Sequence, residues 1–124
     1  MTDKEKFINA LKARTKKLAV DIIAFCETLK TCKASGVITY QLVKSATSVG
    51  ANYRASCRAR SKAEFFSKIC IVVEEADETE YWLEVIKDAG LSKANEELSR
   101  LLIEANEITK IVSKAKNSTY QSKK

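Results

Sequence analysis

The sequence contains no histidine and no proline, and only 3 of its 124 residues are glycine. Without histidine, the chain lacks the side chain that most often serves as acid, base or metal ligand near neutral pH. Few glycines and no prolines argue against turn-rich all-β folds and against the glycine loops of doubly wound α/β folds. No phosphate-binding glycine loop is present, and no cysteine has a histidine partner for nucleophilic catalysis. We therefore expect a protein that is not an enzyme and needs no cofactor and no metal.

The cysteines are also arranged without a recognisable pattern. Cys26, Cys32, Cys57 and Cys70 form no Cys-x-x-Cys pair, which zinc sites and redox motifs would favour. We interpret them as reduced thiols. The longest apolar run, Ile69–Val73, is far too short to cross a membrane, and no secretory signal is visible at the N-terminus. We expect a cytoplasmic protein with no membrane partner.

What the chain does contain is helical periodicity. Apolar residues make up 45% of the sequence and charged residues 31%, which is typical of a globular protein of one domain. Apolar residues recur every three or four positions in four segments, over about 3–33, 39–59, 61–89 and 92–116. Short connections between long helices predict an all-α fold, an up-down-up-down four-helix bundle. We place this domain at residues 1–116, followed by a basic flexible C-terminal tail at 117–124.

The last two helices show the clearest pattern. Their apolar positions step by four and three residues alternately, a heptad rhythm that predicts a left-handed bundle. Ser61 with Glu64 predicts the start of the third helix, and Gly90 predicts its end. Ser92 is the expected N-cap of the fourth helix, and a turn around Gly36 is expected to separate the first helix from the second. The apolar stripes of the four helices are, in order, Phe7, Leu11, Leu18, Ile22, Phe25 and Leu29; Ile38, Leu42, Ala46, Val49, Tyr53 and Cys57; Phe65, Ile69, Val72, Ala76, Thr79, Leu83 and Ile86; and Ala94, Leu98, Leu101, Ala105, Ile108, Val112 and Ala115.

Small and polar residues mark the second helix. Gly50 in a helix interior costs about 1 kcal/mol relative to alanine, and we expect a neighbouring backbone to approach it closely. Asn52 lies at the border of the apolar stripe, where its amide either contacts a ligand or fixes the helix register by a core hydrogen bond. We interpret it as structural.

The third helix has more apolar surface than one stripe needs. Ile71, Tyr81 and Trp82 point away from the stripe on a helical projection. They indicate either a second buried face, and so self-association, or a shield over the ends of the chain's own core.

Charge is divided unevenly along the chain. Residues 1–68 carry 14 basic and 5 acidic side chains, residues 69–112 carry 4 and 11, and residues 113–124 carry 4 and none, within a net charge of +6. Arg54 and Arg58 either form a phosphate-binding patch or pair with acidic residues of the third helix, which include Glu75 and Glu78. We assign all four residues to structure and assembly. Charge balance favours pairing for the two arginines, and without histidine the two glutamates do not resemble a di-iron site. The residues that we expect to contact nucleic acid are Lys4, Lys12, Arg14, Lys16, Lys17, Arg60, Lys62, Lys123 and Lys124; the alternative is that they form a solvated surface.

One stretch resembles a known family. Residues 51–65 read ANYRASCRARSKAEF and are followed by EEADE at 74–78 and YWLE at 81–84. This stretch resembles the four helix bundle protein family, also called the 23S rRNA intervening-sequence protein or S23 family, over about residues 5–115. Many relatives have an Asn-Ile-x-Glu-Gly sequence where this chain has Asn-Tyr-Arg-Ala-Ser. The resemblance implies a bacterial protein that forms a left-handed four-helix bundle and a homopentamer, with no established catalytic activity.

Together these observations predict a non-enzymatic, homo-oligomeric bundle that binds nucleic acid, most plausibly structured RNA, through a basic surface. DNA and an RNA-associated protein are the other partners that we consider. The alternative is a scaffold or protein-interaction module, for example one that belongs to a mobile element, that makes no direct contact with nucleic acid.

Overall fold

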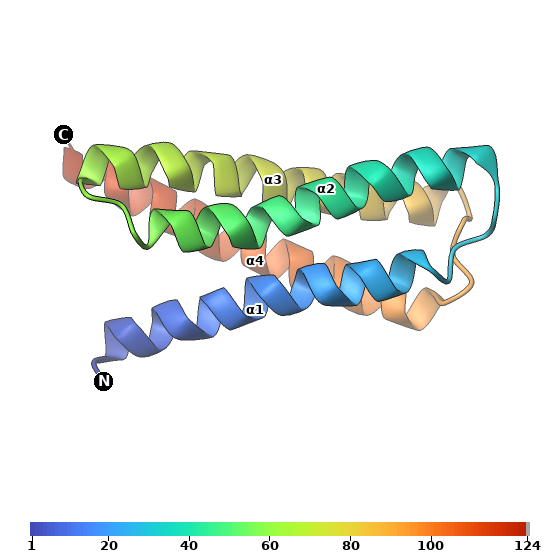
Figure 1. Cartoon of the computed structure of the whole chain (residues 1–124), viewed down its shortest axis with the longest axis horizontal. Coiled ribbons are helices and arrows are strands. Elements are labelled where there is room, and N and C mark those ends of the chain that lie inside the picture. Colours follow the sequence, from blue (N-terminus) through green and yellow to red (C-terminus); the bar gives the residue numbers. More distant parts are fainter. Residues whose placement is uncertain (124) are drawn as a thin grey trace.

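The computed structural model describes the backbone of residues 1–123 and the side-chain surroundings of residues 1–119. In this part of the chain there are four helices and no strand: α1 (Asp3–Cys26), α2 (Lys33–Ser56), α3 (Lys62–Asp88) and α4 (Asn95–Lys123). Successive helices run in opposite directions and pack side by side, and α1 also contacts α4 (Figure 1). The predicted all-α, up-down-up-down four-helix bundle is confirmed; the left-handed supercoil stays a prediction.

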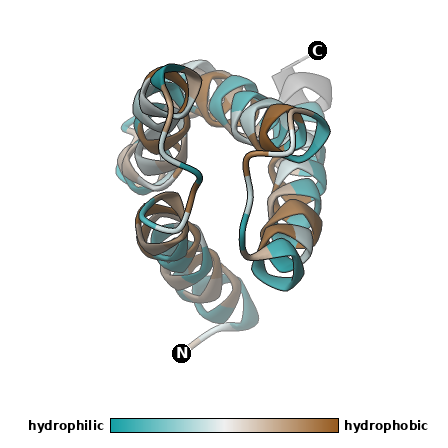
Figure 2. Ribbon diagram, turned by 90° about the vertical axis from the view of Figure 1, so that its right-hand side faces the viewer, coloured by the Kyte–Doolittle hydropathy of each residue, from teal (hydrophilic) through white to brown (hydrophobic). Residues whose placement is uncertain are grey.

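The core is formed by the predicted stripes. Figure 2 looks onto the end of the bundle that carries the α1–α2 and α3–α4 connections, here called the loop end, and shows the helices arranged around a common centre. All seven predicted positions of α3 except Phe65 are buried, and so are the central positions of α4. Phe7 is an exception, because its side chain remains 52% exposed in the first turns of α1. Among the described residues, no helix is long and apolar enough to cross a membrane.

The ends of α3 follow the sequence signals. The Ser61 hydroxyl accepts a hydrogen bond from the Glu64 backbone N–H at 3.1 Å, as an N-cap does. Gly90 lies just after the helix with φ +66°, a conformation that favours glycine. Both predictions are confirmed.

The connection between α1 and α2 differs from the prediction. Helix α1 ends at Cys26 and α2 begins at Lys33, so the turn comes earlier than expected and Gly36 lies inside a helix. The reason is Ser35, which the sequence suggested as part of the turn. Its hydroxyl donates to the Lys30 carbonyl at 2.6 Å and accepts from the Cys32 backbone N–H at 3.1 Å, which closes the loop.

The other boundaries shift by a few residues. Helix α2 ends at Ser56 rather than near Ala59, and α4 begins at Asn95, after Ser92 has accepted a hydrogen bond from the Ala94 N–H at 3.0 Å. Helix α4 continues to Lys123, through most of the segment that we expected as a tail. At the loop end, the Lys30 N–H donates to the Leu91 carbonyl at 2.9 Å, which joins the α1–α2 and α3–α4 connections.

Candidate nucleic-acid interface

A groove between α1 and α2 is lined by four cationic side chains. Lys12 and Lys16 come from α1, Arg54 comes from the last turn of α2, and Arg58 lies two residues beyond the end of α2. The groove has a volume of about 560 Å³, and no carboxylate is among the residues that line it. We call it the basic groove. Its other lining residues are small or neutral: Asn9, Ala13, Ala19, Thr47, Gly50 and Ala51.

Helical spacing explains the arrangement. Lys12 and Lys16 are four residues apart, so they lie on one face of α1, about 6 Å apart along its axis. Arg54 lies in the last turn of α2, and Arg58 follows in the connection to α3 and lines the same groove. Because α1 and α2 are antiparallel, the early part of α1 lies beside the end of α2 (Figure 1). The two pairs therefore line opposite walls of one groove.

Gly50 lies where the two helices approach each other. A Cβ atom built on this glycine would lie 3.5 Å from both the carbonyl carbon and the hydroxyl oxygen of Thr15. The predicted close approach is present, but 3.5 Å is an ordinary van der Waals distance. There is room for a methyl group at Gly50.

The cations of the basic groove have no acidic partner in the described part of the chain. We expected Arg54 and Arg58 to pair with the acidic residues of α3, or to form a phosphate-binding patch. Within one chain that pairing is not formed, since neither arginine has a carboxylate within ion-pair distance among the described residues. The physical reason is their position: Arg54, on α2, and Arg58, just after it, line the groove between α1 and α2, whereas the acidic residues belong to α3.

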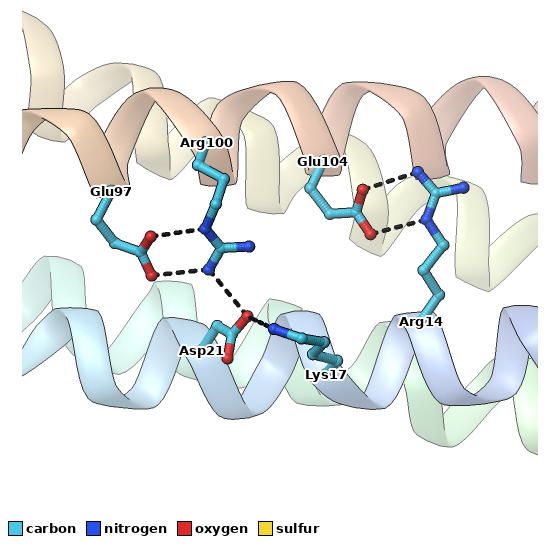
Figure 3. Close-up of polar contacts among 6 residues, drawn as sticks. All are labelled: Arg14, Lys17, Asp21, Glu97, Arg100 and Glu104. Carbon is cyan, nitrogen blue, oxygen red and sulfur yellow. Dashed lines mark hydrogen bonds and ion pairs between the residues drawn. The ribbon is translucent and has the colours of Figure 1, made fainter.

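Two other predicted nucleic-acid contacts are engaged inside the molecule. Arg14 binds Glu104 across the α1–α4 interface through two hydrogen bonds of 2.7 and 2.8 Å (Figure 3). It also forms an ion pair with Glu107. Lys17 pairs with Asp21 at 2.6 Å. Arg14 is thereby part of the packing of α1 against α4, whereas Lys17 pairs within α1 and its side chain stays 68% exposed. Both charges are partly neutralised.

Arg100 completes this α1–α4 network. It donates two hydrogen bonds of 2.7 Å to Glu97 and one of 2.9 Å to Asp21 (Figure 3). Hydrogen bonds from Arg14 lower the pKa of the Glu104 carboxyl, and those from Arg100 lower the pKa of Glu97. The pKa of Asp21 is lowered by hydrogen bonds from Lys17 and Arg100. The network therefore stabilises the ionised carboxylates.

Sequence reasoning missed this network, although a signal was present. Arg14, Lys17 and Asp21 are three and four residues apart, as are Glu97, Arg100 and Glu104, so each trio forms one edge of a helix. The first trio has two basic residues and one acidic residue, and the second has two acidic residues and one basic residue. A comparison of the two helices as neighbours would have shown that these charges are complementary.

The remaining predicted cations lie elsewhere. Lys4, Arg60 and Lys62 surround a separate cleft at the end of the bundle where α1 begins. Arg60 is within 3.7 Å of Glu64, but its side chain is 91% exposed, so that ion pair is weak. Lys123 and Lys124 lie outside the residues whose side chains the structure describes.

The polar residues assigned to structure make mostly local contacts. The Asn52 amide donates to the carbonyl and hydroxyl oxygens of Ser48 at 3.0 and 2.8 Å, within α2. The hydrogen bond that links α2 with α3 in the core is instead formed by Thr79 and Ser45, at 3.0 Å. A hydroxyl pair that sequence reasoning did not single out thus links these two helices in the core.

The two glutamates of α3 differ in their surroundings. Partial burial raises the pKa of Glu75, and the negative charge of Glu78 adds to this effect. Glu78 accepts a hydrogen bond from the Trp82 indole N–H at 3.3 Å. Among the described residues, no group of three or more cysteine and acidic side chains is placed to hold a metal ion.

The extra apolar residues of α3 divide into two kinds. Trp82 is half-buried and packs against the core, with its ring edge-on to Tyr81 at a centroid distance of 5.1 Å. Ile71 and Tyr81 remain exposed, Tyr81 to 54%. The interpretation as a shield over the core therefore fits Trp82, whereas Ile71 and Tyr81 form exposed apolar surface.

Comparison with known proteins now supplies the family. The model of the 23S rRNA-intervening sequence protein family matches residues 9–114. The chain belongs to this family. A solved structure that is similar to it is a protein of unknown function from the S23 ribosomal protein family of Bacteroides thetaiotaomicron, with 31% sequence identity and a TM-score of 0.77. The match covers 89% of this chain and 97% of that one. No curated protein matches the chain.

Family membership confirms the resemblance seen in the sequence and agrees with the four-helix architecture. The match begins at residue 9 and ends at residue 114, so it includes the whole basic groove and the α1–α4 network. Lys4 falls outside it.

Proposed function

We propose that this member of the 23S rRNA-intervening sequence protein family is a non-enzymatic, self-associating bundle that binds the phosphate backbone of structured RNA in the basic groove. One observation carries the proposal: four cations line the two walls of a single groove without an acidic partner among the described residues. Elsewhere on α1, Arg14 and Lys17 form ion pairs with carboxylates. The basic groove thus brings four unpaired cations together in one place.

The chemistry of the groove favours phosphate over bases. The guanidinium groups of Arg54 and Arg58 can each donate two parallel hydrogen bonds to a phosphate, and the two lysines add point charges. No aromatic residue lines the groove, so it offers no ring on which an unpaired base could stack. Contacts of this kind position a nucleic acid without reading its sequence.

Salt-dependent binding tests the proposal. Fluorescence anisotropy of a labelled structured RNA is measured at about 50 and 200 mM salt. Four phosphate contacts predict an affinity on the order of 100-fold weaker at the higher salt. The double variant Lys16→Ala/Arg54→Ala is expected to flatten the slope of log affinity against log salt by about 2.

A matched control separates the groove from net charge. Lys30→Ala/Lys93→Ala removes the same charge from exposed lysines at the loop end of the bundle, and its salt slope should equal that of the unmodified protein. Equal slopes for the two double variants would overturn the assignment to the groove. Competition with duplex DNA of the same length identifies the preferred nucleic acid; preference for DNA would overturn the RNA assignment. If the protein does not bind RNA at the lower salt concentration, the proposal of RNA binding is overturned, and the alternative of a scaffold with a protein partner remains.

Self-association is supported by a different observation, the exposure of Ile71 and Tyr81 on α3. Both residues lie on one helix and border an acidic surface, and an apolar face of this kind is typical of contact between copies. The family resemblance implies five copies. In a closed ring, each copy would use this face against a different surface of its neighbour.

Light scattering tests this part of the proposal. The unmodified protein is expected to have about five times the mass of one chain, 13.8 kDa. Tyr81→Ala should lower that mass, while Tyr40→Ala, a change to a similarly exposed aromatic on α2, should not. An unchanged mass for Tyr81→Ala would remove this face from the interface. Loss of assembly in Lys16→Ala/Arg54→Ala would instead assign the basic groove to contact between copies.

A further inference from the structure

A second cleft lies at the end of the bundle where α1 begins. There α1 leans away from the other helices (Figure 1). The cleft, of about 540 Å³, is bounded by the first turns of α1, the connection between α2 and α3, and the C-terminal part of α4. We call it the end cleft. It shares no lining residue with the basic groove.

The floor of the end cleft is apolar. Phe7, Leu11, Tyr53 and Phe65 line it, together with the half-buried thiol of Cys57. Phe7 occupies a position of the core stripe, yet more than half of its side chain is exposed because α1 diverges here. Water therefore contacts an apolar surface that an apolar ligand could cover with a gain in free energy.

The rim of the end cleft is positively charged. Lys4 comes from α1, and Arg60 and Lys62 flank the N-terminus of α3; no carboxylate lines the cleft among the residues that the structure describes. Only Arg60 has an acidic neighbour within ion-pair distance among the described residues. A ligand that matches both parts of the cleft must combine an apolar body with a negative end.

We propose that the end cleft binds a single-chain amphiphile with an anionic head group, such as a long-chain carboxylate or alkyl phosphate. The alkyl chain covers Phe7 and Phe65, and the head group lies between Lys4 and Lys62. The volume lies within the range of small-molecule sites, about 300–1,000 Å³. Two turns of a helix about 10 Å across would need roughly 850 Å³, which is more than the cleft provides.

Alkylation of Cys57 provides the first test. Iodoacetamide labelling is followed by mass spectrometry of peptides, in the presence of dodecanoate or dodecyl phosphate below their micellar concentrations. Bound amphiphile is expected to slow the labelling of Cys57 at least several-fold. Cys32, which is exposed at the opposite end of the bundle, is the internal control and should react at an unchanged rate. Equal slowing of both thiols, or no slowing of Cys57, would overturn the proposal.

Calorimetric titration with amphiphiles tests the chemistry of the ligand. Affinity should rise roughly fourfold with each methylene group added to the chain until the cleft is full. The dodecanoate and dodecyl phosphate arms identify which head group is preferred. Dodecyltrimethylammonium, which has the opposite charge, should bind at least tenfold more weakly; equal binding would overturn the role of the cationic rim.

Two pairs of variants locate the site. Phe7→Ala is expected to weaken dodecanoate binding about tenfold, whereas Val20→Ala, a change to a similarly exposed residue of α1 outside the cleft, should have no effect. Lys4→Glu/Lys62→Glu should abolish the preference for anions, while Lys30→Glu/Lys93→Glu should preserve it. Equal effects within either pair would overturn the proposal.

A last control separates the amphiphile from a second copy of the chain. If another copy covered the end cleft, Cys57 would become protected as the protein concentration rises without any ligand. That result would also overturn the proposal. Because the readouts do not involve RNA, they succeed or fail independently of the basic groove.

Discussion

At the scale of single residues, Gly50 shows that a glycine can be tolerated without being required. A methyl group there would make ordinary van der Waals contact with Thr15. Glycine in a helix interior costs about 1 kcal/mol relative to alanine. We expect Gly50→Ala to raise the free energy of unfolding by up to about 1 kcal/mol and the melting temperature by a few degrees, as measured by thermal and urea denaturation. A lower melting temperature would show that α1 and α2 pack more tightly than this geometry indicates.

The ion pair of Arg14 predicts a dependence of stability on pH. Its hydrogen bonds lower the pKa of Glu104 in the folded chain, so the carboxylate contributes stability in full above its unfolded pKa of about 4.3. That contribution is lost as the pH falls through the lower folded value. Because both side chains are partly exposed, we expect it to be about 1 kcal/mol or less.

The test compares Arg14→Met with Lys12→Met by urea denaturation from pH 7 to pH 3. Arg14→Met should be about 1 kcal/mol less stable than the unmodified protein at pH 7, and this difference should shrink below pH 4. Lys12 has no acidic partner among the described residues, so its substitution should give a difference that stays small and constant. A loss that does not vary with pH in Arg14→Met would mean that its alkyl packing matters more than its charge.

The burial of single residues could be predicted from the sequence, whereas their pairing with other residues could not. Burial of Ile69, Val72 and Leu83 followed from the spacing of apolar residues, which reports one helix at a time. The partners of Arg14 and Arg54 depend on which edge of α1 faces which neighbour. A pattern along one helix carries no information about that choice, so it could not show that Arg54 has no acidic partner within the described part of the chain.

At the scale of helices, the N-cap of α3 should account for part of its stability. Ser61 accepts the hydrogen bond of an otherwise unpaired backbone N–H in the first turn. We expect Ser61→Ala to lower the free energy of unfolding by about 1 kcal/mol in chemical denaturation. Ser67→Ala, a change within the exposed part of the same helix, is the control and should be close to neutral.

Helix ends were predictable where a side-chain cap and a glycine agreed, as they do for α3. They were wrong by several residues between α1 and α2, because Ser35 and Gly36 are typical of a turn as well as of a helix start. The Ser35 hydrogen bonds that decide between the two involve Lys30 and Cys32, and such three-dimensional contacts cannot be read from residue preferences alone.

At the scale of the whole molecule, the two ends of the bundle differ. At the loop end, the Lys30–Leu91 hydrogen bond joins the two connections. At the other end, Leu11 is the first residue of α1 whose side chain is buried. We expect backbone amides 5–10 to exchange with deuterium faster than those in the middle of α2 and α3, as measured by hydrogen exchange and mass spectrometry. Slow exchange at 5–10 in dilute protein would mean that this end of α1 is held by contacts with another molecule.

The bundle itself could be predicted because helix periodicity, charge and loop length all indicate the same architecture. The basic groove could be predicted only in part. Its cations were identified, but Lys12 and Lys16 were grouped with Arg14 and Lys17, and Arg54 and Arg58 were assigned to structure. Only the packing angle of α1 against α2 shows which cations face one another, and sequence spacing does not determine that angle.

The even number of helices has a practical consequence. Helix α1 begins and α4 ends at the same end of the bundle, beside the end cleft (Figure 1). A purification tag or a fused domain at either terminus would therefore leave the bundle next to that cleft and could obstruct it. A circular permutant that begins within the α1–α2 connection would move both new termini to the opposite end, and would carry any tag away from the ligand.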